Sequence, residues 1–124
     1  MIHLDTHVLI WLALRRSHRL STRARALVER DESHISPMVM LELEILFERG
    51  KIDRDAASLI ERLSGRIELA ISQTPLPAIV DRARSFAWTR DPFDRLIVAN
   101  AMADGARLVT ADQTILANFA DAVW

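Results

Sequence analysis

A chain of 124 residues, half of them apolar, is long enough and apolar enough for a hydrophobic core, and we expect a single domain over residues 1–124. Its 16 basic and 17 acidic residues give a net charge of −1, which argues against a module that holds nucleic acid by general positive charge but not against an enzyme that meets phosphates through a local metal ion. The absence of cysteine excludes disulfides, thiolate zinc sites and cysteine nucleophiles, and no apolar run reaches the ~18 residues of a membrane span, so we expect a cytoplasmic protein without a membrane segment or a secretory signal.

Short apolar segments alternate with helical patterns along the chain. In chain order we predict a strand over 2–4, helices over 7–16 and 21–31, a strand over 33–36, helices over 36–50 and 53–65, a strand over 67–71, helices over 75–88 and 91–105, a strand over 107–110 and a helix over 111–119, with 122–124 as an edge strand or a tail. Candidate helix caps are Ser21, Ser36, Asp53 and Asp91. This alternation predicts an α/β fold in which a mostly parallel sheet is covered by helices on both faces.

Four acidic residues are candidates for one site, and three of them come at or just after the end of a predicted strand. Asp5 closes the first strand, and Glu42 lies in the second turn of the helix after the second strand. Asp94 lies in the first turn of a later helix, and Asp112 lies two residues past the strand over 107–110. Because sites in parallel sheets form beyond the carboxyl ends of the strands, all four side chains can point into one crevice.

Three of these acids also have a purely structural explanation at helix starts. Asp5 and Asp112 can cap the helices that follow them. Asp94 can form a variant of the capping box with Asp91, although Asp91 suits a capping role better. If all the acids had only such structural roles, their corresponding positions in the topology would be accidental.

Glu42 can be a solvated helix residue, but its neighbours in the sequence are mostly apolar. Glu44 and Glu48 share one helix face at i, i+4 spacing, and we expect that face to be the solvated one. Glu42 lies on the other side of the same helix, which favours a functional role for it.

Four carboxylates in one crevice would repel one another. At a separation of ~5 Å and an effective dielectric of ~20, each pair costs roughly 3 kcal/mol, so the group would destabilise the fold or take up protons. A bound divalent cation offsets this repulsion, and all-oxygen ligands suit Mg²⁺ or Mn²⁺ rather than zinc. Because magnesium commonly binds substrate phosphate, phosphoryl chemistry is the natural hypothesis.

Four segments of the chain also resemble a known family. MIHLDTHVLIWL, ISPMVMLELEIL, RDPFDRLIVANAMADG and LVTADQTI are similar to the successive motifs of PIN domains, in particular those of VapC-like toxins from bacterial type II toxin–antitoxin systems. The resemblance runs from Met1 nearly to Trp124, and DPFDRLIVA is its strongest part. It implies a three-layer α/β/α PIN-like fold, metal-dependent cleavage of RNA, a homodimer and a cognate antitoxin that blocks the active site.

By this resemblance the four acids of the family correspond to Asp5, Glu42, Asp94 and Asp112, and its small hydroxyl residue corresponds to Thr110. The hypothesis is that Asp5, Asp94 and Asp112 hold one or two Mg²⁺ or Mn²⁺ ions, with Glu42 completing the set. The metal would polarise the scissile phosphate and activate a water, releasing a 5′-phosphate and a 3′-hydroxyl. Thr110 would bind a metal-bound water or orient Asp112, or else be a plain turn residue.

The histidines are interpreted as structural. His3 and His7 straddle a strand–helix junction and therefore lack the shared helical face that a zinc pair needs. We expect His18 and His34 at the surface or in loops. No histidine metal site is predicted.

The arginines and tryptophans are ambiguous. Lys51 is the only lysine, and arginine suits bidentate phosphate contact, but a GC-rich genome gives the same bias. We expect Arg95 to form a salt bridge on a helix surface rather than a phosphate contact. Trp11, Trp88 and Trp124 are interpreted as core or interface residues rather than platforms for stacked bases.

Two alternatives to a nuclease stay open. An aspartyl-phosphate phosphatase of the haloacid dehalogenase type also places an aspartate at the end of its first strand, but it needs a second aspartate two residues later, where this chain has His7. A catalytically inactive PIN-like binding module would keep the fold without turnover. The identity of the RNA, of the antitoxin and of the metal is left open by the sequence.

Overall fold

The computed structural model describes residues 1–124, and its centre is a sheet of five strands that all run parallel. In sheet order the strands are β3 (Leu69–Ile71), β2 (Ser33–Ile35), β1 (Ile2–Leu4), β4 (Arg107–Val109) and β5 (Ala122–Val123). The predicted parallel sheet is confirmed, and the last residues of the chain form an edge strand rather than a tail.

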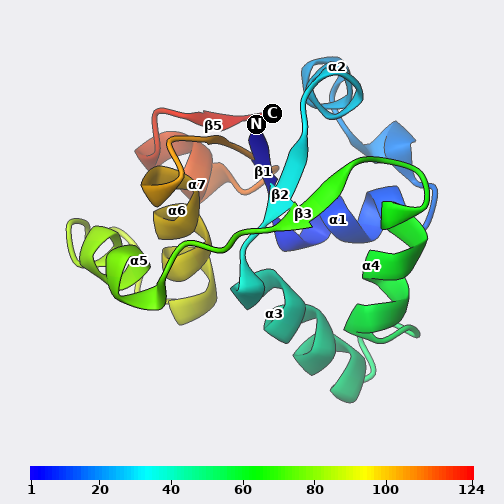
Figure 1. The fold of residues 1–124 in the computed structure, drawn as a ribbon, viewed down its shortest axis with the longest axis horizontal. Coiled ribbons are helices and arrows are strands. Elements are labelled where there is room, and N and C mark those ends of the chain that lie inside the picture. Colours follow the sequence, from blue (N-terminus) through cyan, green and yellow to red (C-terminus); the bar gives the residue numbers. More distant parts are fainter.

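Helices cover both faces of this sheet. They are α1 (Thr6–Ala13), α2 (Thr22–Arg30), α3 (Pro37–Glu48), α4 (Ala56–Ser64), α5 (Leu76–Ala83), α6 (Pro92–Ala103) and α7 (Gln113–Asn118), with a short 3₁₀ turn, η1 (Ser17–Arg19), after α1. Figure 1 shows α1 and α4 on one side of the sheet and α5, α6 and α7 on the other, which is the predicted three-layer α/β/α arrangement. No helix combines the length and the apolar character that crossing a bilayer requires.

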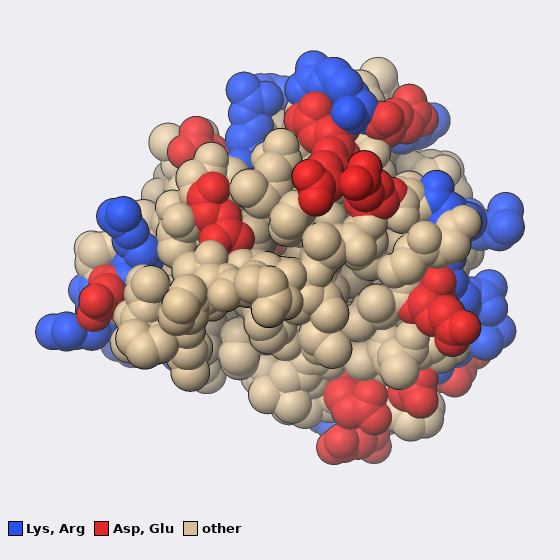
Figure 2. Space-filling view, viewed as in Figure 1, with Lys and Arg blue, Asp and Glu red and all other residues tan.

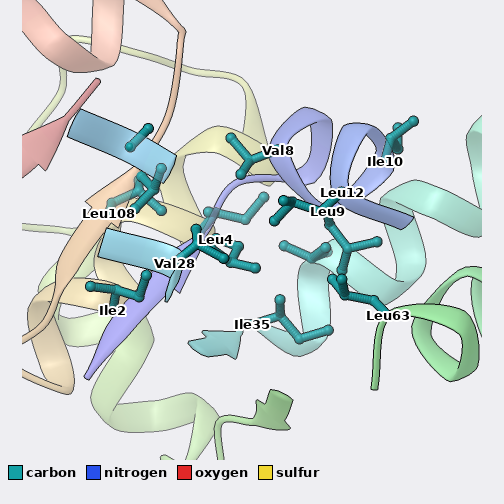
Figure 3. Close-up of a cluster of buried hydrophobic side chains, with 14 of the residues drawn as sticks. Ile2, Leu4, Val8, Leu9, Ile10, Leu12, Val28, Ile35, Leu63 and Leu108 are labelled. Atoms are coloured by element: carbon teal, nitrogen blue, oxygen red, sulfur yellow. The ribbon is translucent and has the colours of Figure 1, made fainter. Parts of the chain in front are cut away.

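The core lies between the sheet and the helices on the α1 side. In Figure 3 the side chains of Ile2 and Leu4 from β1 lie near those of Leu9 from α1 and Ile35 from β2, and all four are fully buried. Burial of each such side chain stabilises the fold by roughly 1.5–3 kcal/mol. Because alternate strand residues face opposite sides, His3 points to the other layer, where it meets the end of α6.

The strand order creates a crevice beyond the carboxyl ends of the two inner strands β1 and β4. From β1 the chain proceeds to β2 and β3 on one side, whereas β4 and β5 lie on the other side of β1. Neighbouring parallel strands whose connections leave in opposite directions open a crevice beyond their carboxyl ends. The segments after β1 and β4, which carry Asp5 and Asp112, therefore meet there.

α1 ends earlier than the sequence predicts. It stops at Ala13 rather than at residue 16, because Arg15 adopts a left-handed backbone conformation with φ of 57°. The backbone N–H of Arg16 then donates to the carbonyl of Trp11 at 2.6 Å, which closes the helix end.

α4 begins later than predicted, and its cap is Asp55 rather than Asp53. The carboxylate of Asp55 accepts from the backbone N–H of Ser58 at 2.9 Å. The carboxylate of Glu44 in α3 accepts from the N–H of Ala56 at 3.1 Å. The predicted solvated position of Glu44 is therefore wrong, because this carboxylate satisfies one of the free N–H groups at the start of α4.

α5 ends at Ala83, although the pattern predicts a helix to residue 88. The side chain of Arg95 donates to the carbonyl of Ala83 at 2.9 Å and to that of Phe86 at 2.6 Å. Its guanidinium also lies 5.8 Å from the centre of the Phe86 ring. The predicted salt bridge of Arg95 is therefore wrong, because this arginine holds an irregular segment of backbone in place.

Candidate functional site

A hollow of about 390 Å³ lies beyond the carboxyl ends of β1 and β4. It brings together the four predicted acids and one more, Asp91, although they come from separate parts of the chain. We call it the acidic hollow, and its lining residues are Asp5, His7, Trp11, Glu42, Asp91, Asp94, Ala111 and Asp112.

Asp5 both caps a helix and lines the hollow. One carboxylate oxygen accepts from the backbone N–H of Thr6 at 2.8 Å, at the start of α1. The other accepts from the hydroxyl of Thr110 at 2.6 Å. Only 8% of Asp5 is exposed, and burial raises the pKa of its carboxyl. The capping role therefore does not exclude Asp5 from the site, because the same carboxylate lines the hollow.

Glu42 points toward Asp5 from α3. Its carboxylate accepts a hydrogen bond from the hydroxyl of Thr6, which therefore connects α1 to α3. Burial, followed by the repulsion of Asp5, raises the pKa of Glu42. Glu42 is half-buried and is not the solvated helix residue that the alternative explanation requires.

Two acids at the start of α6 differ in their surroundings: Asp91 caps the helix, whereas Asp94 has a strongly raised pKa. Asp91 is the N-cap, and its carboxylate accepts from the backbone N–H of Phe93 at 2.9 Å and of Asp94 at 3.2 Å. Asp94 is half-buried one turn later, and no hydrogen-bond donor stabilises its carboxylate. Burial, together with the charges of Asp91 and the other acids, raises the pKa of Asp94 to about 7.

Asp112 and Thr110 complete the wall after β4. Asp112 is the N-cap of α7 and accepts from the backbone N–H of Ile115 at 2.9 Å. The hydroxyl of Thr110, which is fully buried, accepts from the N–H of Asp112 at 3.0 Å while it donates to Asp5. Thr110 therefore connects two of the acids, and the carboxylate that it orients is that of Asp5.

The sequence model of the PIN domain family matches residues 2–121, nearly the whole chain. The chain belongs to the PIN domain family. Ribonuclease VapC22 from Mycobacterium tuberculosis (strain ATCC 25618 / H37Rv) is 29% identical over 114 residues, which are 90% of this chain and 87% of the relative. The resemblance of the four sequence segments to PIN domains is thereby confirmed.

Two solved structures share the fold of this PIN domain. A chain in the crystal structure of VapBC2 from Rickettsia felis, bound to a DNA fragment from its promoter, matches with a TM-score of 0.69 at 19% identity and covers 99% of this chain and 96% of its own. A chain of a toxin–antitoxin complex from Klebsiella pneumoniae matches with a TM-score of 0.68 at 20% identity, over 100% and 97% of the two chains. At such identities the match supports the fold rather than the chemistry.

The acids of this PIN domain have the donor chemistry of a divalent-cation site but not a preformed coordination sphere. No three of its acidic and histidine side chains converge closely enough to hold one ion as they stand. Both oxygens of Asp5 and one of Glu42 already accept hydrogen bonds. Hard oxygen donors and the raised pKa of Asp94 nevertheless fit a divalent cation, which would relieve the repulsion between the acids.

His7 and Trp11 also line the hollow of the PIN domain, although the sequence interpretation assigned neither to the site. They lie one turn apart on α1, with ring centres 6.1 Å apart. Trp11 is half-buried and packs against Trp124 at 5.8 Å between ring centres, which agrees with a core or interface position but leaves part of the ring exposed in the hollow. Their i, i+4 spacing on the helix that Asp5 begins is the signal that could have placed them here.

A second polar cluster of the PIN domain was missed altogether. The ring Nε2 of His3 lies 2.7 Å from the carboxylate of Asp104, which also accepts from the hydroxyl of Ser72 at 2.8 Å and from the amide of Asn100 at 3.2 Å. Burial is the main cause that lowers the pKa of His3. His34 stacks on His3 and is half-buried in β2, so it lies in a strand rather than in a loop.

Proposed function

We propose that this PIN domain is a divalent-metal-dependent endoribonuclease of the VapC type that hydrolyses phosphodiester bonds in RNA. The observation that carries the proposal is the convergence of Asp5, Glu42, Asp94 and Asp112 in one hollow from four segments of the chain. A relative over most of the chain is named a ribonuclease, which supports the same activity.

In this proposal Asp5, Asp94 and Asp112 hold one or two Mg²⁺ or Mn²⁺ ions, and Glu42 completes the ligand set. When bound, such a metal stabilises charge on a phosphate and lowers the pKa of a bound water. The chain itself supplies the positioning, because Thr110 orients Asp5 and Thr6 orients Glu42. Asp94, with a pKa near 7, must lose its proton to bind a cation, so we expect metal affinity to rise between pH 6 and pH 8.

We infer a protein partner from the structural neighbours, which come from a VapBC2 complex and a toxin–antitoxin complex. The partner would be a cognate antitoxin that covers the acidic hollow. A homodimer is also part of the proposal, since α3 exposes Leu41 and Phe47 and α5 exposes Leu76 and Val80. Because its substrate would be cellular RNA, we place the protein in the cytoplasm.

The test is cleavage of RNA by purified protein with Mg²⁺, with Mn²⁺ and with a chelator. Asp5→Asn and Asp94→Asn should abolish cleavage and keep a folded circular dichroism spectrum. Asp53→Asn is the matched control, because Asp53 is an exposed acid outside the hollow. Equal cleavage by Asp94→Asn and by the control would defeat the assignment of the site.

The lack of a preformed metal group favours one competing function, an inactive PIN-like binding module. Isothermal titration with Mn²⁺ separates the two functions. The nuclease should bind the ion and lose that binding in Asp94→Asn. A protein that binds no Mn²⁺ and cleaves no RNA would be the binding module instead.

A further inference from the structure

Arginines gather at the end of α1 that lies away from the acidic hollow. Arg15, Arg62 and Arg66 line one hollow of about 400 Å³. Arg15 and Arg66 also line an adjoining hollow of about 330 Å³, whose floor contains the apolar side chains of Leu12 and Leu63. We call the first of these hollows, with its three arginines, the arginine pocket. Figure 2 shows blue side chains along the edge beside α4, the helix that carries Arg62.

The charges of these arginines are only partly balanced within the protein: Glu61 lines the arginine pocket and Glu29 the adjoining hollow, but neither forms an ion pair with an arginine there. The arginine ion pairs in the structure are Arg30 with Asp31 and Arg84 with Asp81, and neither pair involves the arginine pocket. The guanidinium of Arg66 donates to the carbonyl of Leu12 at the end of α1, which fixes its position. Three arginines against the single carboxylate of Glu61 leave the arginine pocket with a net positive charge, so an anion between the guanidinium groups would be bound favourably.

Arg15 occupies a backbone conformation that normally requires glycine. Its φ is 57°, and the other two residues with positive φ are Gly50 and Gly105, which likewise follow helix ends. A side chain in this region is disfavoured, and such residues cluster at functional sites. The chain therefore keeps an arginine where glycine would suit the fold better, which indicates that its side chain has a function in the pocket.

Aromatic and cationic side chains connect the acidic hollow to the arginine pocket along α1. His7 and Trp11 line the acidic hollow, and the guanidinium of Arg19 lies 5.9 Å from the centre of a Trp11 ring. Arg15 follows one turn after Trp11 in the sequence. Trp11 packs on Trp124 but keeps part of its ring exposed in the acidic hollow, so it can also offer a surface to a base, contrary to the sequence interpretation. Exposed rings interleaved with arginines are the pattern of single-stranded nucleic-acid binding, whereas an acidic peptide has no need of the rings.

We propose that the arginine pocket binds a backbone phosphate of the substrate RNA and that the adjoining apolar-floored hollow receives the attached base. α1 has eight residues and is therefore about 12 Å long. At about 3.4 Å per nucleotide of a stacked strand, this phosphate lies roughly four nucleotides from the bond cleaved at the acidic hollow. The inference rests on the proposed nuclease function and adds a second contact that sets the minimum length of the substrate.

The test measures binding of a 12-nucleotide single-stranded RNA and of a trinucleotide, in an Asp94→Asn background that prevents cleavage. The double substitution Arg15→Gly and Arg62→Gln should raise the Kd of the 12-mer about tenfold and leave that of the trinucleotide unchanged. It should also reduce the slope of log K against log salt by about 0.7, the value for one lost phosphate contact on a single strand. The matched control, Arg54→Gln with Arg107→Gln, removes two exposed arginines elsewhere.

Arg15→Gly alone guards against unfolding as an explanation, because glycine suits the backbone at this position and the Tm should stay equal or rise. Equal Kd values for the pocket variant and the control would overturn the inference, and if the wild type still cleaves RNA the proposed nuclease function would stand. Weaker binding of a decaglutamate peptide with unchanged RNA affinity would assign the pocket to an acidic protein segment and also overturn it. A wild type that neither binds nor cleaves RNA would defeat both proposals.

Discussion

The two ends of α6 hold aspartates in opposite electrostatic surroundings. At its start, burial and the neighbouring acids raise the pKa of Asp94 to about 7. At its end, burial alone would raise the pKa of Asp104, but hydrogen bonds from Thr74, Ser72 and His3 prevail and lower it. The difference shows how to separate the two kinds of acid in one fold: Asp104 is supplied with donors and stabilises the structure, whereas Asp94 is surrounded by acids and is available for a cation.

The largest expected effect is on activity, from Asp94→Asn. In the proposed function Asp94 is a metal ligand, and loss of such a ligand removes several kcal/mol of transition-state stabilisation, so we expect RNA cleavage to fall by about 10³-fold or more. The same change removes a repelled carboxylate, so the Tm at pH 8 without divalent ions should rise, by roughly 3–6 °C for each kcal/mol gained. RNA cleavage on gels measures the loss of activity, and a thermal melt measures the change in Tm. A lower Tm for Asp94→Asn would contradict the conclusion that Asp94, unlike Asp104, is electrostatically destabilised in the folded protein.

The reverse pattern is expected for Asp104→Asn. The substitution weakens hydrogen bonds from His3, Ser72 and Thr74 to a charged acceptor, and the free energy of unfolding should fall by about 2–3 kcal/mol. Urea denaturation measures this loss. At a temperature where the variant is folded, its kcat for RNA cleavage should match that of the wild type, and a large drop in kcat would show that this end of α6 also serves the site.

Thr110→Val tests whether the hydroxyl between two acids supports the site as well as the fold. The valine keeps the shape but removes the bonds to Asp5 and to the N–H of Asp112, so we expect a loss of about 1–2 kcal/mol in stability and of 10–100-fold in activity. Thr114→Val, at an exposed position of α7, is the control. A loss of stability without any loss of activity would limit Thr110 to a structural role.

The pH dependence of stability should separate the two aspartates directly. Between about pH 4 and pH 7 the folded protein binds more protons at Asp94 than the unfolded chain does, so in the absence of metal the free energy of unfolding falls as the pH rises. Asp104 acts in the opposite sense: its contribution is present above the ordinary pKa of 3.8 and is lost as the pH falls through its lower folded value.

Thermal melts with a chelator from pH 4.5 to pH 8 measure this dependence. The Tm of the wild type should decline with pH, and that of Asp94→Asn should decline less. Addition of Mn²⁺ at pH 8 should raise the Tm of the wild type by mass action and leave Asp94→Asn nearly unchanged. A wild-type Tm that is insensitive to Mn²⁺ would remove the electrostatic argument for a cation.

The smallest expected effect compares two further aspartates, one that accepts a hydrogen bond at a helix start and one that does not. Asp55→Ala removes the acceptor for the N–H of Ser58 and should cost about 1 kcal/mol. Asp53→Ala, two residues earlier, removes no such bond and should stay within about 0.5 kcal/mol of the wild type. Chemical denaturation of the pair checks the corrected start of α4.

The sequence predicts well those features that depend on near neighbours in the chain. Ser21 accepts from Ala24, Ser36 from Met38 and Asp91 from Phe93, so three of the four predicted caps are confirmed. The contacts of Arg95 could not be predicted in this way. Its position in a helix follows from the sequence pattern, but its partners are carbonyls nine and twelve residues away in an irregular segment. Contacts of that kind depend on the path of the backbone between the two segments, which a local sequence pattern does not determine.

Residue types and their spacing were sufficient to determine the alternation of strands and helices, the place of the acids after strand ends and the resemblance to PIN domains. The tertiary structure was needed to bring Thr110 to Asp5 and Asp104 to His3, because these pairs are 105 and 101 residues apart in the chain. Sheet order and register set such distances, and they follow from the packing of all layers together rather than from any one segment. The same packing gave Asp94 and Asp104, on one helix, opposite shifts in pKa.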